Sequence, residues 1–295
     1  MSLADRAIDR PEARSQTAAA ARPATKQGPS YLYLLLVLPA AFFLFPWVWL
    51  VLTSVKVQTQ IVVWPPVWVP NPIYLENYLE AVRIFPFVQY MANTLTIAGL
   101  VVVGRLLSCS IAAYAFSHLR WPGRDAVFVL VLSTMMLPFQ VTMIPQYIMF
   151  HRIGWTNSIL PLTVPAFLGD AFFIFLLRQF FLTIPHELID AATIDGSSEF
   201  GTFARIALPL AQPALATVVV LSFLNAYNDF LGPLLYLTDP EKRTLSLGMQ
   251  MFSNDYSTSW GPQMATSVLI TAPLVIVYFF TQKRFIQGIA TTGFK

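Results

Sequence analysis

Charged residues are scarce in this sequence of 295 residues. Lys, Arg, Asp and Glu together make up 11% of the chain, whereas an average soluble domain is about a quarter charged. Hydrophobic residues make up 56%, and the mean hydropathy is +0.61. Such a composition predicts an integral membrane protein. The isoelectric point near 9.0 then reflects basic loops on the cytoplasmic side of a membrane rather than nucleic-acid binding.

Metal-binding and catalytic motifs are also missing. The single cysteine, Cys109, lies in an apolar stretch, which excludes an intrachain disulfide and a cysteine-based metal site. The three histidines are far apart and lack the spacing of metal ligands. Neither a G-x-S-x-G nucleophile motif nor a G-x-x-x-x-G-K-[ST] phosphate loop occurs. We therefore expect this chain to bind no cofactor, and we expect another chain to bind any ATP.

Six long apolar stretches follow an amino-terminal arm, residues 1–30, that has almost no large apolar side chains and is expected to be disordered. Each stretch approaches the roughly 20 residues that a helix needs to cross a bilayer. The sequence thus predicts an all-α, multi-pass membrane domain over residues 31–295. The predicted spans are Tyr31–Thr53, Phe87–Phe116, Ala126–Phe150, Ile159–Leu182, Leu210–Leu235 and Met264–Phe280.

The distribution of basic residues predicts the orientation. With the amino terminus inside, twelve of the 18 Lys and Arg residues face the cytoplasm and five face outward, while Arg105 lies within a span. This bias favours both termini in the cytoplasm. The polar segment between the fourth and fifth spans is then cytoplasmic.

This polar segment, residues 185–209, has the pattern of two short helices joined by a turn. Pro185 and Glu187 suit the first turn of a helix. Gly196 can adopt the left-handed conformation that ends a helix, and Ser197 or Ser198 can cap the next one. Pro209 marks the entry to the fifth span. An apolar stripe is predicted on the second helix, formed by Phe200, Phe203 and Ile206. On these features alone, the segment either packs only on its own bundle or docks another protein.

The segment also matches a longer pattern: Asp190-Ala191-Ala192, three residues, Gly196, nine residues, then Ile206-x-Leu208-Pro209. This resembles the E-A-A-x3-G-x9-I-x-L-P loop of the permease subunits of ABC importers, with Asp190 in place of Glu. Further stretches, such as residues 112–125, 175–192 and 225–240, resemble the maltose-type branch of carbohydrate-uptake permeases. Tyr227 stands where that branch often has Trp. The likeness runs from Tyr31 to the carboxyl terminus.

The resemblance implies a non-catalytic subunit that forms half of a carbohydrate pathway across the cytoplasmic membrane by alternating access. It implies two cytoplasmic ATPase subunits that bind ATP and Mg, an extracytoplasmic solute-binding protein and a second permease subunit, more commonly a distinct chain. The loop would dock into a cleft of the ATPase. The residues expected in this coupling loop are Glu187, Asp190, Ala191, Ala192, Gly196, Phe200, Phe203, Ile206, Leu208 and Pro209.

Several polar residues fall within the apolar stretches. Asp170 lies about ten residues into the predicted fourth helix, where it either serves function or forms a structural ion pair. Arg105 in the second helix either snorkels or pairs. Other polar side chains either line a hydrophilic path with Asp170 or join helices: Gln140, Asn93, Asn225, Asn228 and Asp229.

Two other classes of function remain open from the sequence. A stand-alone secondary transporter would need neither the docking loop nor an ATPase. An intramembrane enzyme built on Asp170 would need a second carboxylate or a nucleophile–base pair at the same depth, and the sequence makes none apparent.

Overall fold

The computed structural model describes residues 30–254 and 257–292, and the chain divides after Pro46 into two compact units. The predicted amino-terminal arm lies outside the described residues, apart from Ser30. Helix α1 (Ser30–Ser54) begins in the first unit and ends in the second, and it reproduces the first predicted span almost residue for residue. The architecture that follows concerns the second unit alone.

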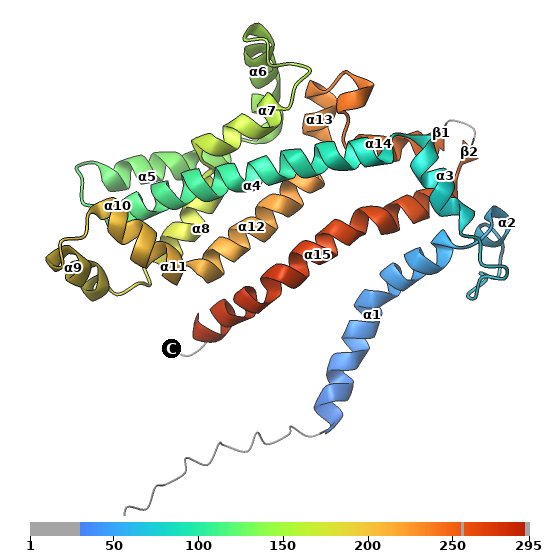
Figure 1. Ribbon diagram of the computed structural model, residues 1–295, viewed down its shortest axis with the longest axis horizontal. Coiled ribbons are helices and arrows are strands. Elements are labelled where there is room, and N and C mark those ends of the chain that lie inside the picture. Colours follow the sequence, from blue (N-terminus) through green and yellow to red (C-terminus); the bar gives the residue numbers. More distant parts are fainter. Residues whose placement is uncertain (1–29, 255–256, 293–295) are drawn as a thin grey trace, which may run out of the picture. The chain divides into compact units, whose positions relative to one another are not determined.

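The central helix of this unit is α4 (Phe87–Ser117), which corresponds to the second predicted span (Figure 1). Its 31 residues extend about 46 Å, which is longer than the roughly 30 Å hydrocarbon core of a bilayer. No proline interrupts this apolar stretch, so the backbone hydrogen bonds can continue from end to end. Helices α8 (Ala171–Phe181) and α12 (Gln212–Tyr227) pack along α4.

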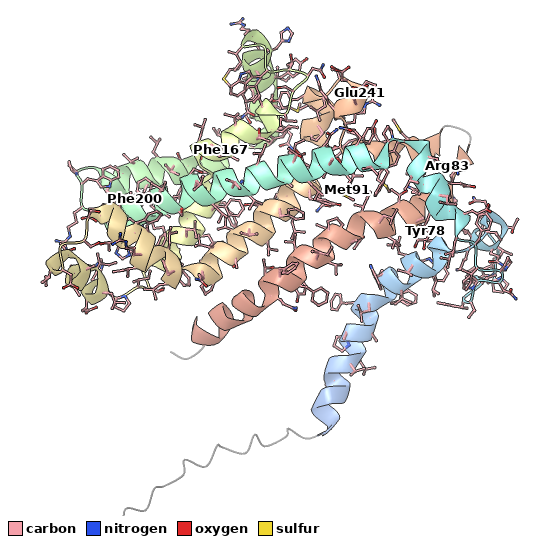
Figure 2. All side chains as sticks on the ribbon, viewed as in Figure 1. Tyr78, Arg83, Met91, Phe167, Phe200 and Glu241 are labelled. Atoms are coloured by element: carbon pink, nitrogen blue, oxygen red, sulfur yellow. The ribbon has the colours of Figure 1, made fainter. Side chains whose placement is uncertain are left out.

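A glycine in α4 allows a third segment to come close. A Cβ atom on Gly104 would lie 2.7 Å from the Phe167 ring, which belongs to the 3-10 helix η2 (Val164–Leu168). Figure 2 shows Phe167 against α4. Ser108 strengthens the contact, since its hydroxyl donates to the carbonyl oxygen of Ala166 at 2.9 Å. Small residues at helix crossings are typical of membrane bundles.

The third predicted span is not a continuous helix. It consists of α5 (Arg124–Ser133), η1 (Thr134–Met136) and α6 (Phe139–Arg152), and the two halves are bent by 97°. The predicted span is bent here because Pro138 follows Leu137 at the bend. A proline disfavours the helical conformation of the residue before it, and Leu137 is extended, with ψ 112°.

The fourth span is interrupted as well. It contains α7 (Leu160–Thr163) and η2, then a break at Gly169 and Asp170, then α8. Gly169 has φ +105°, a conformation that glycine tolerates and that ends the helical path. Residues Leu160–Phe181 still form a segment long and apolar enough to cross a membrane.

The fifth span begins after a sharp bend. A helical run, α10 (Glu199–Thr202), the π-helical turn η3 (Phe203–Ala207) and α11 (Leu208–Leu210), is bent by 78° from α12. After α12 the chain breaks again before α13 (Leu231–Tyr236), so the predicted continuous helix Leu210–Leu235 is wrong in detail. Among the described residues, four segments can each cross a membrane, or up to six if each bent pair counts as one span.

The last predicted span lies inside α15 (Trp260–Thr292), which packs against α12 and against α3 (Glu76–Ile84). Two antiparallel strands of two residues each pair with one another, which the prediction of an all-α fold did not include. The remaining elements are short: α2 (Gln58–Ile61), α9 (His186–Ile194), η4 (Pro240–Lys242), α14 (Leu245–Gly248), η5 (Met249–Phe252), β1 (Ser253–Asn254) and β2 (Ser257–Thr258).

Two apolar cores hold the second unit together. One surrounds the carboxyl-terminal half of α4, and its buried residues include Cys109, Tyr114, Phe173, Leu177, Phe181, Phe203 and Val218. The other surrounds the amino-terminal half of α4, and its buried residues include Phe85, Tyr90, Phe223, Tyr227, Leu245 and Phe252. Between them, the middle of α4 faces a pocket with mostly apolar walls and four polar side chains.

Candidate functional site

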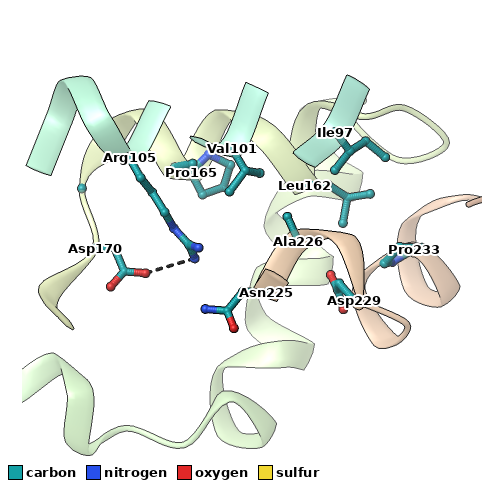
Figure 3. A pocket seen from close by; sticks show the side chains of 12 residues that line it. Ile97, Val101, Arg105, Leu162, Pro165, Asp170, Asn225, Ala226, Asp229 and Pro233 are labelled. Atoms are coloured by element: carbon teal, nitrogen blue, oxygen red, sulfur yellow. Dashed lines mark ion pairs between the residues drawn. The ribbon is translucent and has the colours of Figure 1, made fainter. Parts of the chain in front are cut away.

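The pocket beside the middle of α4 has a volume of about 250 Å³ (Figure 3). Most of its wall is apolar, and α4, α7, η2 and α13 contribute Ile97, Val101, Leu162, Pro165, Ala166 and Pro233. The polar lining consists of four side chains, namely Arg105, Asp170, Asn225 and Asp229. Ligand sites commonly have this composition, with apolar walls and a few fixed polar groups that orient the ligand.

Asp170 lies at the break in the fourth span, and not inside a helix as predicted. Its backbone is extended, with φ −135° and ψ 122°, and it caps the amino terminus of α8. The carboxylate oxygen Oδ1 accepts hydrogen bonds from the backbone N–H groups of Phe172 and Phe173, at 3.0 and 3.4 Å. Asp is among the preferred residues at this position because it satisfies N–H groups that the helix leaves unpaired. The cap therefore stabilises the break.

Arg105 pairs with the same carboxylate. Its Nη2 atom lies 3.1 Å from Asp170 Oδ2, and its guanidinium also stacks on the Phe173 ring, 4.8 Å from the ring centre. Of the two alternatives for Arg105, the structure has the paired one. The other two nitrogen atoms of the guanidinium, Nε and Nη1, are buried and have no hydrogen-bond partner. Leaving a buried charged donor unpaired is costly, about 1–3 kcal/mol or more.

Asn225 and Asp229 line the opposite side of the pocket, at the end of α12. Asp229 Oδ1 accepts a hydrogen bond from the backbone N–H of Gly232 at 3.1 Å, so this carboxylate stabilises the start of α13. The Ser246 hydroxyl donates to the backbone carbonyl of Asp229 at 2.7 Å. The break after α12 is thus held from two sides, and its carboxylate faces the pocket.

The structure brings together three of the six polar residues predicted along a path: Asp170, Asn225 and Asp229. The other three lie elsewhere. Asn93 donates to the backbone carbonyls of Glu241 and Arg243, at 2.8 and 2.9 Å, and ties that segment to α4. Asn228 donates to the carbonyl of Leu224 within its own helix, and Gln140 is exposed in the first turn of α6.

Arg105 is the pocket residue that the predicted path lacked. The signal was present, because an arginine inside an apolar stretch is a functional candidate by default. Its partner could not be identified, since Asp170 lies 65 positions away in the sequence. Within the described ranges, no cluster of three or more His, Cys, Asp or Glu side chains could hold a metal ion.

The predicted coupling loop, residues 185–209, forms the expected helix–turn–helix. Helix α9 ends before Gly196, which has φ +80°, and Gly196 lies at the turn. The Ser198 hydroxyl then accepts a hydrogen bond from the backbone N–H of Gly201 at 3.2 Å and caps α10. Figure 1 shows α9 and α10 at the end of the unit where α4 ends.

One face of this loop is open and the other is packed. Phe200 is 72% exposed, and Ile194, Glu187, Asp190 and Ala191 are exposed as well. The predicted apolar stripe is divided, because Phe203 is packed inward while Phe200 is exposed. Phe203 is 6% exposed, and its ring lies 5.1 Å from that of Tyr114 in the core. Ala192 is also buried; Ile206 and Leu208 are half-buried, while Pro209 is exposed.

A pair of histidines joins the loop to α4. The rings of His118, just after α4, and His186, at the start of α9, lie 5.2 Å apart. His118 Nε2 lies 3.1 Å from the carbonyl oxygen of Phe181, which can only accept. Burial, and to a smaller extent the neighbouring His186, lowers the pKa of His118 below its usual value. The junction therefore favours a neutral His118.

Comparisons with known proteins agree on one family. The family described as "Binding-protein-dependent transport system inner membrane component" matches residues 104–291. The chain is 34% identical to the arabinooligosaccharides transport system permease protein of Halalkalibacterium halodurans, over 77% of this chain and 81% of that one. It is 32% identical to the sn-glycerol-3-phosphate transport system permease protein of Brucella abortus, over 88% and 95%.

Solved structures and a further relative extend this likeness. The trehalose/maltose transport system permease protein of Thermococcus litoralis is 32% identical, over 88% of this chain and 94% of that one. A chain of a bacterial ABC transporter that imports the acidic polysaccharide alginate superimposes with a TM-score of 0.75 at 25% identity, over 86% of this chain and 95% of that one.

Proposed function

This chain belongs to the family of binding-protein-dependent transport system inner-membrane components, and we propose that it forms half of the pathway of an ATP-driven carbohydrate importer. It is embedded in a membrane by several apolar helices. Three relatives are permease proteins whose names specify arabinooligosaccharides, sn-glycerol-3-phosphate and trehalose/maltose. A sugar or a closely related polyol derivative is therefore the proposed cargo.

The proposed mechanism is alternating access driven by partner ATPases. Two cytoplasmic ATPase subunits would bind ATP and Mg, and the loop of residues 185–209 would dock onto one of them. The permease helices would then switch as rigid bodies between an inward-facing and an outward-facing state, because ATP binding favours one of the two states. One loop per chain leaves a second ATPase without a partner, so a second permease subunit is part of the proposal. A solute-binding protein would deliver the sugar at the outer side. In this arrangement residues 31–295 form the membrane domain, and both chain termini lie in the cytoplasm.

The observation that carries the proposal is the open face of the loop. Ile194 and Phe200 expose large apolar side chains beside the carboxylates of Glu187 and Asp190. An exposed apolar group rimmed by polar residues is typical of a protein–protein interface. In the proposed role, Ala191 and Gly196 have side chains small enough to let the ATPase surface approach the backbone at the turn. Ala192, Phe203, Ile206, Leu208 and Pro209 join the loop to the bundle, where a movement of the loop reaches α12.

We also propose that the substrate passes the pocket at Asp170, Asn225 and Asp229. Gln140, Asn93 and Asn228 remain weaker candidates, because two of them already bond to nearby backbone carbonyls. The pocket does contain the second carboxylate that an intramembrane enzyme would need. However, Oδ1 and Oδ2 of Asp170 already hold the α8 cap and Arg105, which disfavours Asp170 as a free acid or base.

The test is co-purification of the assembled importer with its ATPase subunit. Deletion of residues 190–209 is expected to abolish both ATPase binding and uptake, while an Asp190→Lys variant of the intact fold should weaken both. Solubility and thermal stability of the second variant serve as the folding control. Uptake that persists without any ATPase would overturn the proposal in favour of a secondary transporter.

A further inference from the structure

The guanidinium of Arg105 lines the pocket and has bonding capacity that Asp170 does not use. Arg carries five N–H donors in a fixed plane, and Asp170 engages the group through Nη2 alone. Nε and Nη1 are buried without a partner. Figure 3 shows the guanidinium reaching from α4 towards Asp170, with Asn225 below it on the other side. Nη2 carries a second N–H group, from which a ligand with oxygen acceptors could accept a hydrogen bond.

The charge balance of the lining decides which acceptors are favoured. Arg105 is the single cation among the twelve lining residues, and Asp170 already neutralises it at 3.1 Å. Asp229 adds a second carboxylate. The lining is therefore neutral or negative, whichever protonation state Asp229 takes. A phosphate, sulfonate or carboxylate group would enter without a countercharge, which is unfavourable in a partly dehydrated site.

An uncharged polyhydroxylated ring fits the same lining better. Its ring and hydroxyl oxygens can accept from the Arg105 guanidinium, while its hydroxyl groups can donate to the Asp229 carboxylate and to the Asn225 side-chain oxygen. The apolar walls suit the C–H faces of a sugar. The volume, about 250 Å³, is slightly below the roughly 300 Å³ at which pockets for drug-sized ligands begin. The pocket thus has room for about one sugar ring.

We propose that this pocket is a subsite for one uncharged sugar ring of the transported carbohydrate, with Arg105 as its principal donor, and that it excludes anionic groups. The inference rests on the proposed function and narrows its substrate class. It separates this chain's cargo from the sn-glycerol-3-phosphate named for one relative and the acidic polysaccharide named for the structural neighbour. It aligns the cargo with the neutral saccharides named for the other two relatives.

The charge of the pocket can be probed with thiol reagents, without knowing the sugar. In a Cys109→Ala background, Asn225→Cys or Val101→Cys introduces one thiol into the lining of the full chain, within membranes that contain the whole importer. Methanethiosulfonate reagents with cationic, neutral and anionic head groups are then compared. We expect the ratio of the cationic to the anionic rate to exceed the ratio for a small free thiol in solution by about tenfold. Adding Asp229→Asn should reduce this ratio.

A ratio equal to or below that of the free thiol would overturn the proposal. Failure of all three reagents to react would also overturn it, since the pocket would then be closed to solutes. Labelling needs no ATP, so these outcomes are independent of whether the ATPase coupling of the proposed function holds.

A transport panel tests the ligand class directly. The importer reconstituted in proteoliposomes is offered arabinotriose, maltotriose and trehalose on one side of the comparison, and glycerol-3-phosphate and an alginate trisaccharide on the other. Uptake confined to neutral sugars supports the subsite. Uptake of either anionic solute at a rate equal to that of any neutral sugar overturns it.

Discussion

Arg105 on α4 lies 3.1 Å from Asp170, the residue that caps α8, and this ion pair joins the central helix to the break in the fourth span. The two carboxylate oxygens of Asp170 have different partners, since Oδ1 caps α8 and Oδ2 pairs with Arg105. A single side chain therefore stabilises both an interruption of the backbone and a charge inside an apolar bundle. These two requirements meet at one residue in the lining of the pocket.

The first prediction concerns the charge of Asp170. Asp170→Asn keeps a good helix cap but leaves Arg105 without a countercharge. Breaking a buried pair costs about 3–5 kcal/mol, and because the two side chains remain 18% and 29% exposed, we expect about 2–3 kcal/mol here. The measurement is the thermal unfolding midpoint of the purified importer in detergent.

A double variant is the matched control. Arg105→Gln with Asp170→Asn removes both charges and leaves two polar groups that can still bond, so it should recover most of the lost stability. If Asp170→Asn alone unfolds at the wild-type temperature, the pair does not stabilise the bundle.

The sequence predicts the presence of these charges but not their arrangement. A charged residue inside an apolar stretch is visible in one dimension, so Asp170 and Arg105 could be recognised as exceptional. Which of them meet depends on how α4 and α8 pack, and that depends on contacts such as Gly104 with Phe167. Hydropathy alone does not show which residues of two helices face each other. It therefore could not predict the Arg105–Asp170 pair or the pocket.

The breaks in the spans were missed for a related reason. Prolines within membrane helices are tolerated, so Pro138 by itself did not distinguish a kink from a sharp bend of 97°. The glycine at position 169 precedes an Asp that can cap a helix, which is a local signal for a new helix start. It was outweighed by the continuous apolar character of residues 159–182. Conversely, the turn at Gly196 was predicted, because its flanking residues are polar and no apolar run conceals them.

The second prediction concerns the turn of the coupling loop. Gly196 has φ +80°, and a Cβ there would contact nothing within 4 Å, so any penalty comes from the backbone alone. Gly196→Val should strain the turn by about 1–2 kcal/mol and reduce ATPase co-purification and sugar uptake. Gly196→Asn, which tolerates this conformation, should keep both. Normal uptake by the valine variant would remove Gly196 from its mechanical role.

The third prediction uses two glycines of α4. A Cβ on Gly104 would lie 2.7 Å from the Phe167 ring, whereas a Cβ on Gly99 would meet nothing within 4 Å. Gly104→Ala should therefore destabilise the bundle by about 1–3 kcal/mol through overpacking. Gly99→Ala should be neutral, or stabilising by up to about 1 kcal/mol, because alanine favours helices. Equal thermal midpoints for the two variants would mean that η2 does not pack on α4 as described.

The fourth prediction concerns pH at the junction of α4 and the loop. The pKa of His118 is lowered in the folded state by burial and by His186, so the unfolded chain binds more protons between the folded pKa and about pH 6.5. Stability from this site is complete above that pH and decreases as the pH falls through the folded pKa. The thermal midpoint of the wild type should therefore fall between pH 7.5 and 5.5.

A neutral substitution isolates the histidine in that experiment. The thermal midpoint of His118→Gln should fall less than that of the wild type over the same pH range, since glutamine does not titrate and can still donate to the Phe181 carbonyl. The variant His186→Gln, which removes the neighbouring imidazole, should show an intermediate decrease. Parallel curves for the wild type and His118→Gln would assign the pH dependence to other groups.

The last prediction separates two phenylalanines on the same loop. Phe200 is 72% exposed and Phe203 is 6% exposed, although their ring centres lie only 6.0 Å apart. Phe200→Ala removes contact area that faces outward, so the thermal midpoint should change little, while ATPase binding should weaken. Phe203→Ala leaves a cavity beside Tyr114 and should cost about 3–5 kcal/mol. If Phe200→Ala binds ATPase as well as the wild type does, the open face of α10 is not the docking surface. The interface would then have to lie on α9, at Ile194 and Asp190.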